Sequence, residues 1–299
     1  MYKMIRFTAF LLIDFSTIYS CSGTGRTPLH PGFFIVQFAS GGPLRVCLLA
    51  SGSKGNSLFV ETGETKVLVD AGLSAREIAV RLEKIGVSAS DLNGILISHE
   101  HSDHIRGAGT LARRFKIPVL ISYPASKLTH NHFRSANLVE FESGSAFEFR
   151  DILIDPFPTT HDAADPVGFI IDSHEARMGF ATDLGIATRL VQEKLKNSRV
   201  LVLESNHDEN MLLNGPYPWH LKQRIKSRHG HLSNVDAAEL LTQVMHPGLE
   251  GLFLAHLSEA NNQPEIALEA HRKQLSATTV CSPRIFVGSQ QSVSEVLLL

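Results

Sequence analysis

Short apolar runs rich in β-branched residues alternate with polar turns from residue 44 to the end of the chain. Runs of this length and composition predict buried strands. The predicted strands are Arg45–Ala50, Leu58–Thr62, Lys66–Asp70, Gly94–Ser98, Val119–Ser122, Arg199–Glu204, Gly251–Ala255 and Arg284–Val287. The block Leu138–Phe180 is also strand-rich but is broken by turns, which favours antiparallel pairing there.

Helical periodicity occurs between these strands. Ser74 precedes an amphipathic segment, Ala75–Ile85, that ends at Gly86, as expected for an N-capped helix with a C-terminal glycine. The remaining predicted helices are Ile186–Lys196, Ser233–Met245 and Pro264–Gln274. Two strand-rich halves, each flanked by helices, predict an α/β fold in which two sheets pack face to face with helices outside.

The first 44 residues follow a different pattern. Two cations precede an apolar run that Asp14 interrupts and Cys21 follows, an order that loosely resembles a secretory or lipoprotein leader. A charge inside the run disfavours a working export signal. We therefore expect residues 1–44 to be a poorly ordered extension, which could come from a start codon assigned too far upstream. Residues 45–299 are expected to form a cytoplasmic domain. No other stretch approaches the roughly 20 apolar residues of a membrane span.

Composition narrows the class of protein. A chain of 299 residues, 43% hydrophobic and 19% charged, can bury a sizeable core. With a formal net charge of −2, nucleic-acid binding would require a local basic patch. Three widely spaced cysteines form neither a disulfide framework nor a cysteine-based zinc site. Fifteen histidines are many for this length, and their grouping is informative.

The densest histidine group, His99-Glu-His-Ser-Asp-His104, directly follows the predicted strand Gly94–Ser98. Imidazole and carboxylate groups are ligands that suit Zn, Mn or Fe. His99 and His101 lie two apart in an extended segment, so they point the same way and can share one ion. Asp103 and His104, at the turn into the next helix, would project toward a second ion. The alternative, a solvated loop that is histidine-rich by chance, does not explain this spacing.

A site for two ions needs ligands from elsewhere in the chain. His161, Asp183 and His256 each end or follow an apolar run. Strand ends are positions at which a rigid scaffold can aim side chains. A strand-end histidine is more often an ordinary surface group, so position alone leaves both interpretations open.

Residues 44–299 resemble the metallo-β-lactamase-fold hydrolases, and within them the YycJ/WalJ-like branch of single-domain exonucleases that act on DNA. The resembling segments are 48–57 (LLASGSKGNS), 69–72 (VDAG), 98–104 (SHEHSDH), 203–208 (LESNHD), 230–234 (GHLSN) and 256–262 (HLSEANN). The resemblance covers roughly 85% of the chain and is specific in order and spacing. It implies a four-layer αβ/βα sandwich with two mixed β-sheets.

The resemblance also implies how two divalent ions would be held. Three histidines hold the first ion, an aspartate with two histidines holds the second, and another aspartate bridges both; these are His99, His101 and His161, then Asp103, His104 and His256, then Asp183. Two such ions can ionise a bridging water and stabilise charge on phosphoryl and leaving oxygens. Asp103 would also orient the hydroxide. Zn, Mn and Fe all suit these ligands.

Three further residues are candidates for supporting roles. Asp70, at the end of its strand, would accept a hydrogen bond from the loop or from a liganding histidine, or else be an exposed carboxylate. His231, just before a predicted helix, would protonate the leaving oxygen or grip the phosphate, or else pack beneath the helix cap. For His207 the resemblance implies support or substrate contact rather than metal ligation.

A basic segment lies close to His231 in the sequence. Its members are Lys222, Arg224, Lys226 and Arg228, preceded by Trp219. It would line a path for a phosphate backbone, with Tyr217 and Trp219 stacking on bases, or else be a solvated helix with a buried aromatic at its start. Arg81, by contrast, is expected to be an ordinary solvent-facing helix charge.

These observations predict a metal-dependent hydrolase that acts as a two-metal phosphodiesterase, an exonuclease hydrolysing DNA by attack of a metal-bridging hydroxide. The rival is a small-molecule hydrolase of the same fold that cleaves a thioester, lactone or cyclic phosphodiester. The 73 positions from Asp183 to His256 leave too little room for the large inserted domain of RNA-processing members of the superfamily. A non-catalytic binding protein is disfavoured because no ligand position is missing. The oligomeric state stays open, and no membrane partner is expected.

Overall fold

A computed structural model describes residues 43–173 and 176–299. The predicted extension, apart from its last two residues, lies outside this range. The described chain begins its regular structure at Arg45, the first residue of β1. Within the described residues, no helix is long and apolar enough to cross a membrane.

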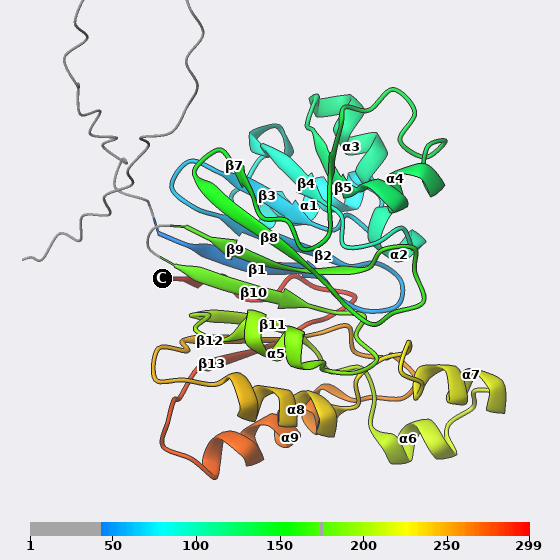
Figure 1. Cartoon of the computed structure of the whole chain (residues 1–299), viewed down its shortest axis with the longest axis vertical. Coiled ribbons are helices and arrows are strands. Elements are labelled where there is room, and N and C mark those ends of the chain that lie inside the picture. Colours follow the sequence, from blue (N-terminus) through cyan, green and yellow to red (C-terminus); the bar gives the residue numbers. More distant parts are fainter. Residues whose placement is uncertain (1–42, 174–175) are drawn as a thin grey trace, which may run out of the picture. The chain divides into compact units, whose positions relative to one another are not determined.

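Two seven-stranded mixed sheets form the centre of the fold (Figure 1). The first has the order β14 (Leu297–Leu298), β1 (Arg45–Ala50), β2 (Ser57–Glu61), β3 (Lys66–Val69), β4 (Gly94–Leu96), β5 (Val119–Ser122) and β6 (Leu138–Phe141). The second has the order β13 (Arg284–Val287), β12 (Gly251–Ala255), β11 (Val200–Glu204), β10 (Arg177–Ala181), β9 (Val167–Asp172), β8 (Ile152–Pro158) and β7 (Phe147–Phe149).

The two sheets share one pattern of strand direction. In the first sheet β3 to β6 run parallel, and in the second β10 to β13 run parallel. The remaining neighbours pair antiparallel, including β7 to β10, as expected for the turn-rich block. The predicted pair of sheets with outer helices is confirmed.

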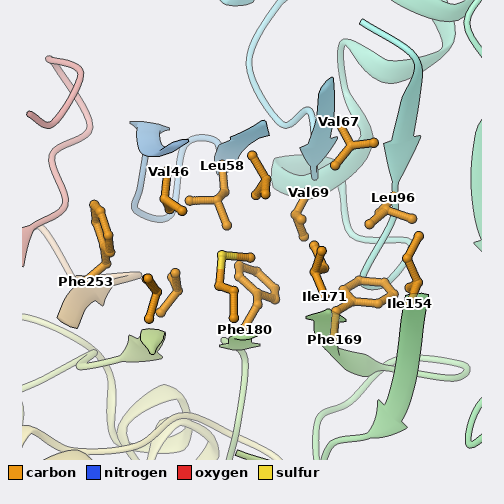
Figure 2. Packing of buried hydrophobic residues seen from close by; sticks show 14 of the residues in the cluster. Val46, Leu58, Val67, Val69, Leu96, Ile154, Phe169, Ile171, Phe180 and Phe253 are labelled. Atoms are coloured by element: carbon orange, nitrogen blue, oxygen red, sulfur yellow. The ribbon is translucent and has the colours of Figure 1, made fainter. Parts of the chain in front are cut away.

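The sheets pack face to face through alternate side chains of their strands. Val46 of β1 and Leu58 of β2 point toward Phe180 and Phe253 of the opposite sheet (Figure 2). The intervening residues, such as Leu49, pack on the outer face of the first sheet instead. This alternation follows from the two-residue repeat of a strand. Each such fully buried side chain contributes about 1.5–3 kcal/mol through its removal from water.

Helices cover the outer face of each sheet (Figure 1). The first sheet is covered by α1 (Ala75–Lys84), α3 (Ala108–Phe115) and α4 (Tyr123–Leu128), and the second by α5 (Arg189–Leu195), α8 (Asn234–Val244) and α9 (Pro264–Ser276). The predicted cap of α1 is present, since the Ser74 hydroxyl accepts from the backbone N–H of Glu77. The expected helix near Ile186 begins later, because Thr188 caps α5.

The short helices α4 and α6 (Glu209–Asn214) were absent from the sequence expectation. Helices this short carry little periodic signal. A helix was expected after Asp103 and His104 without stated bounds, and the structure has α2 (Ser102–Ile105) and α3 there. A helix was also one of the two interpretations of the basic segment, where the structure has α7 (Trp219–Ile225).

Candidate metal centre

The polar residues singled out in the sequence gather where several strands of both sheets end. His99 follows β4 in the first sheet, and His161, Asp183 and His256 follow β8, β10 and β12 in the second. Strands β8, β10, β11 and β12 all run in the same direction, so their carboxyl ends meet at one edge. Ligands commonly bind outside such carboxyl ends.

The seven candidate ligands fall into groups that share this edge. The side-chain atoms of His99, His101 and His161 lie within 4.8 Å of one another. Those of Asp103, His104 and His256 form a second group of the same kind. The two groups coincide with the allocation that the family resemblance implies.

Asp183 lies between the two groups. Its Oδ1 is 3.7 Å from Nε2 of His161 and 3.6 Å from Nε2 of His256. Its Oδ2 is 3.4 Å from Nε2 of His104. One buried carboxylate therefore faces members of both groups, which is the position a bridging ligand requires.

Hydrogen bonds at the outer nitrogens orient three of the histidines. Nδ1 of His104 donates to Asp70 at 2.8 Å, Nδ1 of His256 to Glu204 at 2.9 Å, and Nδ1 of His161 to the Gly230 carbonyl at 3.2 Å. With the proton on Nδ1, the Nε2 lone pair points into the cluster. Such partners fix the tautomer and the ring orientation of metal-binding histidines.

Asp70 is buried beneath the histidine loop. Its carboxylate accepts from the Ser98 backbone and hydroxyl, both at 2.8 Å, as well as from His104. Only 1% of the residue is exposed, so it is not the solvated strand-end carboxylate of the alternative interpretation.

Three of these residues have a left-handed backbone. The φ angles of Asp70, Asp183 and His256 are 61°, 55° and 56°. Non-glycine residues in this region cost of order 1 kcal/mol or more each, and such strain clusters at functional sites. The sharp turn at each strand end brings the side chain back over the edge of the sheet.

The electrostatics of the cluster suit cations. Asp183 Oδ2 and His256 Nε2 are buried without a hydrogen-bond partner among the described residues. Burial alone would lower the pKa of His256, but the Asp183, Asp103 and Glu204 carboxylates raise it to about 10. For His104, too, Asp183 and Asp70 overcome burial and raise the pKa well above its usual value. The carboxylates thus stabilise positive charge here, and the side chains fit divalent ions.

His231 lies at the rim of the same cluster. Its Nδ1 donates to Glu204 at 2.8 Å, and its ring centroid is 5.1 Å from those of His161 and His256. Its side chain is 20% exposed, so it is not packed under the helix cap. It belongs to a third group with Asp183, Glu204 and His256.

Glu204 is a site residue that sequence analysis missed. It ends β11, is fully buried, and accepts from two histidines and from the backbone N–H groups of Leu184 and Leu232 at 3.0 Å each. The available signal was a single acidic residue closing an otherwise apolar strand, within a segment that carries the family resemblance.

His207 lies outside the ligand groups. It is 2% exposed, pairs through its backbone with Ser233, and its Nδ1 has no hydrogen-bond partner among the described residues. Ser233 in turn caps α8, so His207 connects the end of β11 to that helix. Among the described residues, His207 is in none of the groups that could hold an ion.

The basic segment runs along α7 and into the loop that reaches His231. Arg224 pairs with Asp162, whose own Oδ1 is 3.3 Å from Nε2 of His161. Lys226 lies 3.6 Å from Glu209. The segment therefore borders the candidate centre, but two of its four cations already face carboxylates.

Lys222, Arg228 and Trp219, the other members of the segment, have no carboxylate partner among the described residues. Lys222 donates to the Leu213 carbonyl at 2.7 Å. Because a carbonyl oxygen is neutral, this contact does not compensate the positive charge of Lys222. The Arg228 backbone lies so close to Gly185 that a Cβ there would come within 2.2 Å of its carbonyl oxygen. Trp219 is 63% exposed, so the aromatic at the start of α7 is not buried, whereas the helix itself is solvated and has no buried residue.

Comparisons with known proteins agree with the fold and identify the family. The model of the beta-lactamase superfamily domain matches residues 65–256. Exodeoxyribonuclease YycJ of Bacillus anthracis is 38% identical over 227 residues, 75% of this chain and 86% of that protein. Exodeoxyribonuclease WalJ of Streptococcus pneumoniae serotype 2 is 38% identical over 225 residues, 74% and 84% of the two chains.

Solved structures share the architecture. The metallo-beta-lactamase fold protein YhfI from Bacillus subtilis superposes with a TM-score of 0.65, covering 86% of this chain and all of that one. A diphosphatase of the PhnP family superposes with a TM-score of 0.62, covering 87% and 99%. The identities are 17% and 14%, so these likenesses establish the fold alone.

Proposed function

This chain belongs to the metallo-β-lactamase-fold superfamily of hydrolases, and on that premise we propose that it is a two-metal exonuclease that hydrolyses DNA. The observation that carries the proposal is the place of Asp183, whose two oxygens face both ligand groups. The substrate class is supported by the names of its relatives, which are exodeoxyribonucleases.

The ligand set supports two divalent ions of the Zn or Mn type, with Fe also suited to nitrogen and oxygen ligands. The three histidines His99, His101 and His161 would hold one ion, and Asp103, His104 and His256 the other, with Asp183 between them. When bound, such ions supply Lewis acidity toward water and toward the phosphoryl oxygens.

The protein's own groups would handle the protons. Oδ2 of Asp103 faces His104 and His256, at 3.5 and 3.7 Å, so Oδ1 is left to orient the attacking water. With both ring nitrogens protonated, His231 would donate the Nε2 proton to the departing sugar oxygen, while its Nδ1–H stays bound to Glu204 and the ring is left neutral. Glu204 thereby keeps the imidazole turned toward the open side of the cluster.

The basic segment would hold the DNA strand beside this centre. Lys222 and Arg228 supply charge toward phosphates, and the exposed ring of Trp219 offers a surface on which a base can stack. Arg224 and Lys226 would contribute less while they face Asp162 and Glu209.

We further assign the activity to residues 45–299, with residues 1–44 as an extension to that domain. The free thiols of Cys47 and Cys281 favour a reducing compartment, and we propose the cytoplasm as the place of action.

The test compares nucleic acid with small esters. Metal-loaded protein is incubated with 5′-phosphorylated duplex DNA, single-stranded DNA and RNA of the same sequence, beside a thioester, a lactone and a cyclic phosphodiester. We expect mononucleotide release from DNA, lost together with bound metal in Asp183→Ala and retained in His130→Ala, which removes an exposed histidine. Ester turnover without nucleotide release would favour the small-molecule hydrolase instead.

A further inference from the structure

The loop between β1 and β2 contacts all three residues of the group formed by Asp103, His104 and His256. The Ser51 hydroxyl accepts from the His256 backbone N–H at 2.6 Å. Nδ2 of Asn56 lies 3.2 Å from Nε2 of His104 and 3.4 Å from Oδ2 of Asp103. This loop has no role in the mechanism above.

The orientation of the Asn56 amide follows from its other partner. The Gly52 backbone N–H lies 2.9 Å from the opposite end of the amide, and an N–H donor requires an acceptor there. That atom is therefore the carbonyl oxygen, and the NH2 group faces the cluster. The side chain is well buried, at 7% exposure.

The backbone around Asn56 is held in place by close packing. Asn56 N–H donates to the Asp103 carbonyl and Gly72 N–H donates to the Asn56 carbonyl, both at 2.8 Å. A Cβ on Gly72 would lie 1.6 Å from the Asp103 carbonyl oxygen, so only glycine allows this approach. Gln290 clamps the same loop, accepting from Lys54 and donating to Gly55. The amide is thus presented by a rigid support.

The contact with Asp103 is selective for one oxygen. The amide reaches Oδ2, the same oxygen that faces His104 and His256. A donor that occupies one lone pair of Oδ2 holds the carboxylate against rotation. Oδ2 then stays turned toward the ligand group, and Oδ1 stays turned away from it.

We propose that Asn56 is a positioning residue for the second ion, because its amide fixes the Asp103 carboxylate with a single oxygen directed at that ion. The inference rests on the two-ion proposal. Residues that orient metal ligands typically change metal affinity by 10–100-fold when they are replaced. Loss of the Asn56 amide should therefore weaken the binding of one ion and leave the other unaffected.

The experiment titrates the metal-free protein with zinc by calorimetry, without substrate. Wild-type protein should bind two ions. Asn56→Ala should weaken one binding step by about 10–100-fold and leave the other unchanged. Asn56→Leu has nearly the same shape, lacks the N–H groups and adds no charged ligand, so it should show the same loss. It supplies the answer if Asn56→Ala does not fold.

The matched control is Ser57→Ala in the same chain segment, which removes a buried hydrogen bond to the Asp70 carbonyl without touching Asp103. It should leave both binding steps unchanged. Four results would each overturn the inference: wild-type affinity in Asn56→Leu, equal weakening of both steps, the same loss in Ser57→Ala, or a single ion in wild-type protein. Because the readout is ion binding, failure to cleave DNA would remove the proposed nuclease function and leave this result standing.

Discussion

Glu204 Oε1 lies 2.8 Å from Nδ1 of His231, and the same oxygen lies 2.9 Å from Nδ1 of His256. One fully buried carboxylate therefore orients both the residue proposed to protonate the leaving group and a residue proposed to hold an ion. Burial alone would raise the pKa of Glu204, but the two histidines hold it at about 2. Glu204 is thus an anionic acceptor at neutral pH.

Replacing Glu204 by glutamine tests this shared acceptor. The amide would turn an N–H toward a histidine N–H or toward one of the two backbone donors, so at least one partner loses its acceptor. We expect a fall in activity of about 10–100-fold, in line with other residues that orient metal ligands. Steady-state kinetics on labelled DNA measures it, with Glu193→Gln on the surface as control. Activity within twofold of wild type would contradict the role.

Removal of metal should destabilise the protein. The cluster places Asp183, Glu204 and Asp103 together, and without cations their charge is compensated only by histidine protonation. An ion at 100 times its dissociation constant adds about 2.7 kcal/mol to the free energy of unfolding. Calorimetric scans with and without a chelator should therefore show a lower melting temperature after chelation. Asp183→Asn should lose most of that difference, and equal shifts in both proteins would count against the site.

The salt dependence of DNA binding tests the basic segment. Each phosphate contact changes the slope of log affinity against log salt by about 0.9. In a His231→Ala background, which keeps the seven proposed ligands, Lys222→Gln with Arg228→Gln should flatten the slope by about 2. Arg224→Gln should do less, because Arg224 already pairs with Asp162. Fluorescence anisotropy measures the slopes, with Lys84→Gln as control, and an unchanged slope in the double variant would exclude this path.

The free energy of unfolding is expected to depend on pH through Asp151, which is not one of the residues of the candidate metal centre. Asp151 accepts hydrogen bonds from Thr62 at 2.9 Å, from the Glu64 backbone at 3.2 Å, and from Thr65. Partial burial opposes ionisation, but these hydrogen bonds hold the pKa of Asp151 below its usual value. The ionised carboxylate therefore stabilises the folded state fully above about pH 4, and the contribution disappears as the pH falls through the lowered pKa.

Urea unfolding of wild type and Asp151→Ala measures this contribution. The difference in free energy of unfolding between the two should be largest near neutral pH and should narrow below about pH 4. Glu148→Ala, an exposed strand position, provides the control. A difference that stays constant down to pH 3 would show that the hydrogen bonds do not depend on the charge.

Sequence patterns predicted most of the strands and the candidate ligands because both signals are local. Buried strands show as β-branched runs, and the His99–His104 segment carries four proposed ligands within six positions. Order and spacing then pointed to His161, Asp183 and His256 through the family resemblance. Sequence patterns did not predict contacts between residues that lie far apart in the sequence.

Arg81 illustrates that limit. It was expected to face solvent on an amphipathic helix, yet it is 6% exposed. Its guanidinium donates to the carbonyls of Leu49 at 2.8 Å and Gln290 at 3.0 Å, and pairs with Glu77. Gln290 is more than 200 positions from Arg81 in the sequence, so no local sequence pattern predicts this contact. Glu204 escaped notice for the same reason, since its four donors come from three separate segments.

The proposed ligands are spread from β4 to the end of β12, and this spread has a consequence for biosynthesis. A nascent chain that has emerged only as far as α8 carries both aspartates and four of the five histidines, but it lacks His256. The proposed two-ion centre would therefore be assembled late, after most of the second sheet has left the ribosome. Uptake of the second ion would then follow the synthesis of β12, and a product terminated before His256 would be inactive toward phosphodiesters.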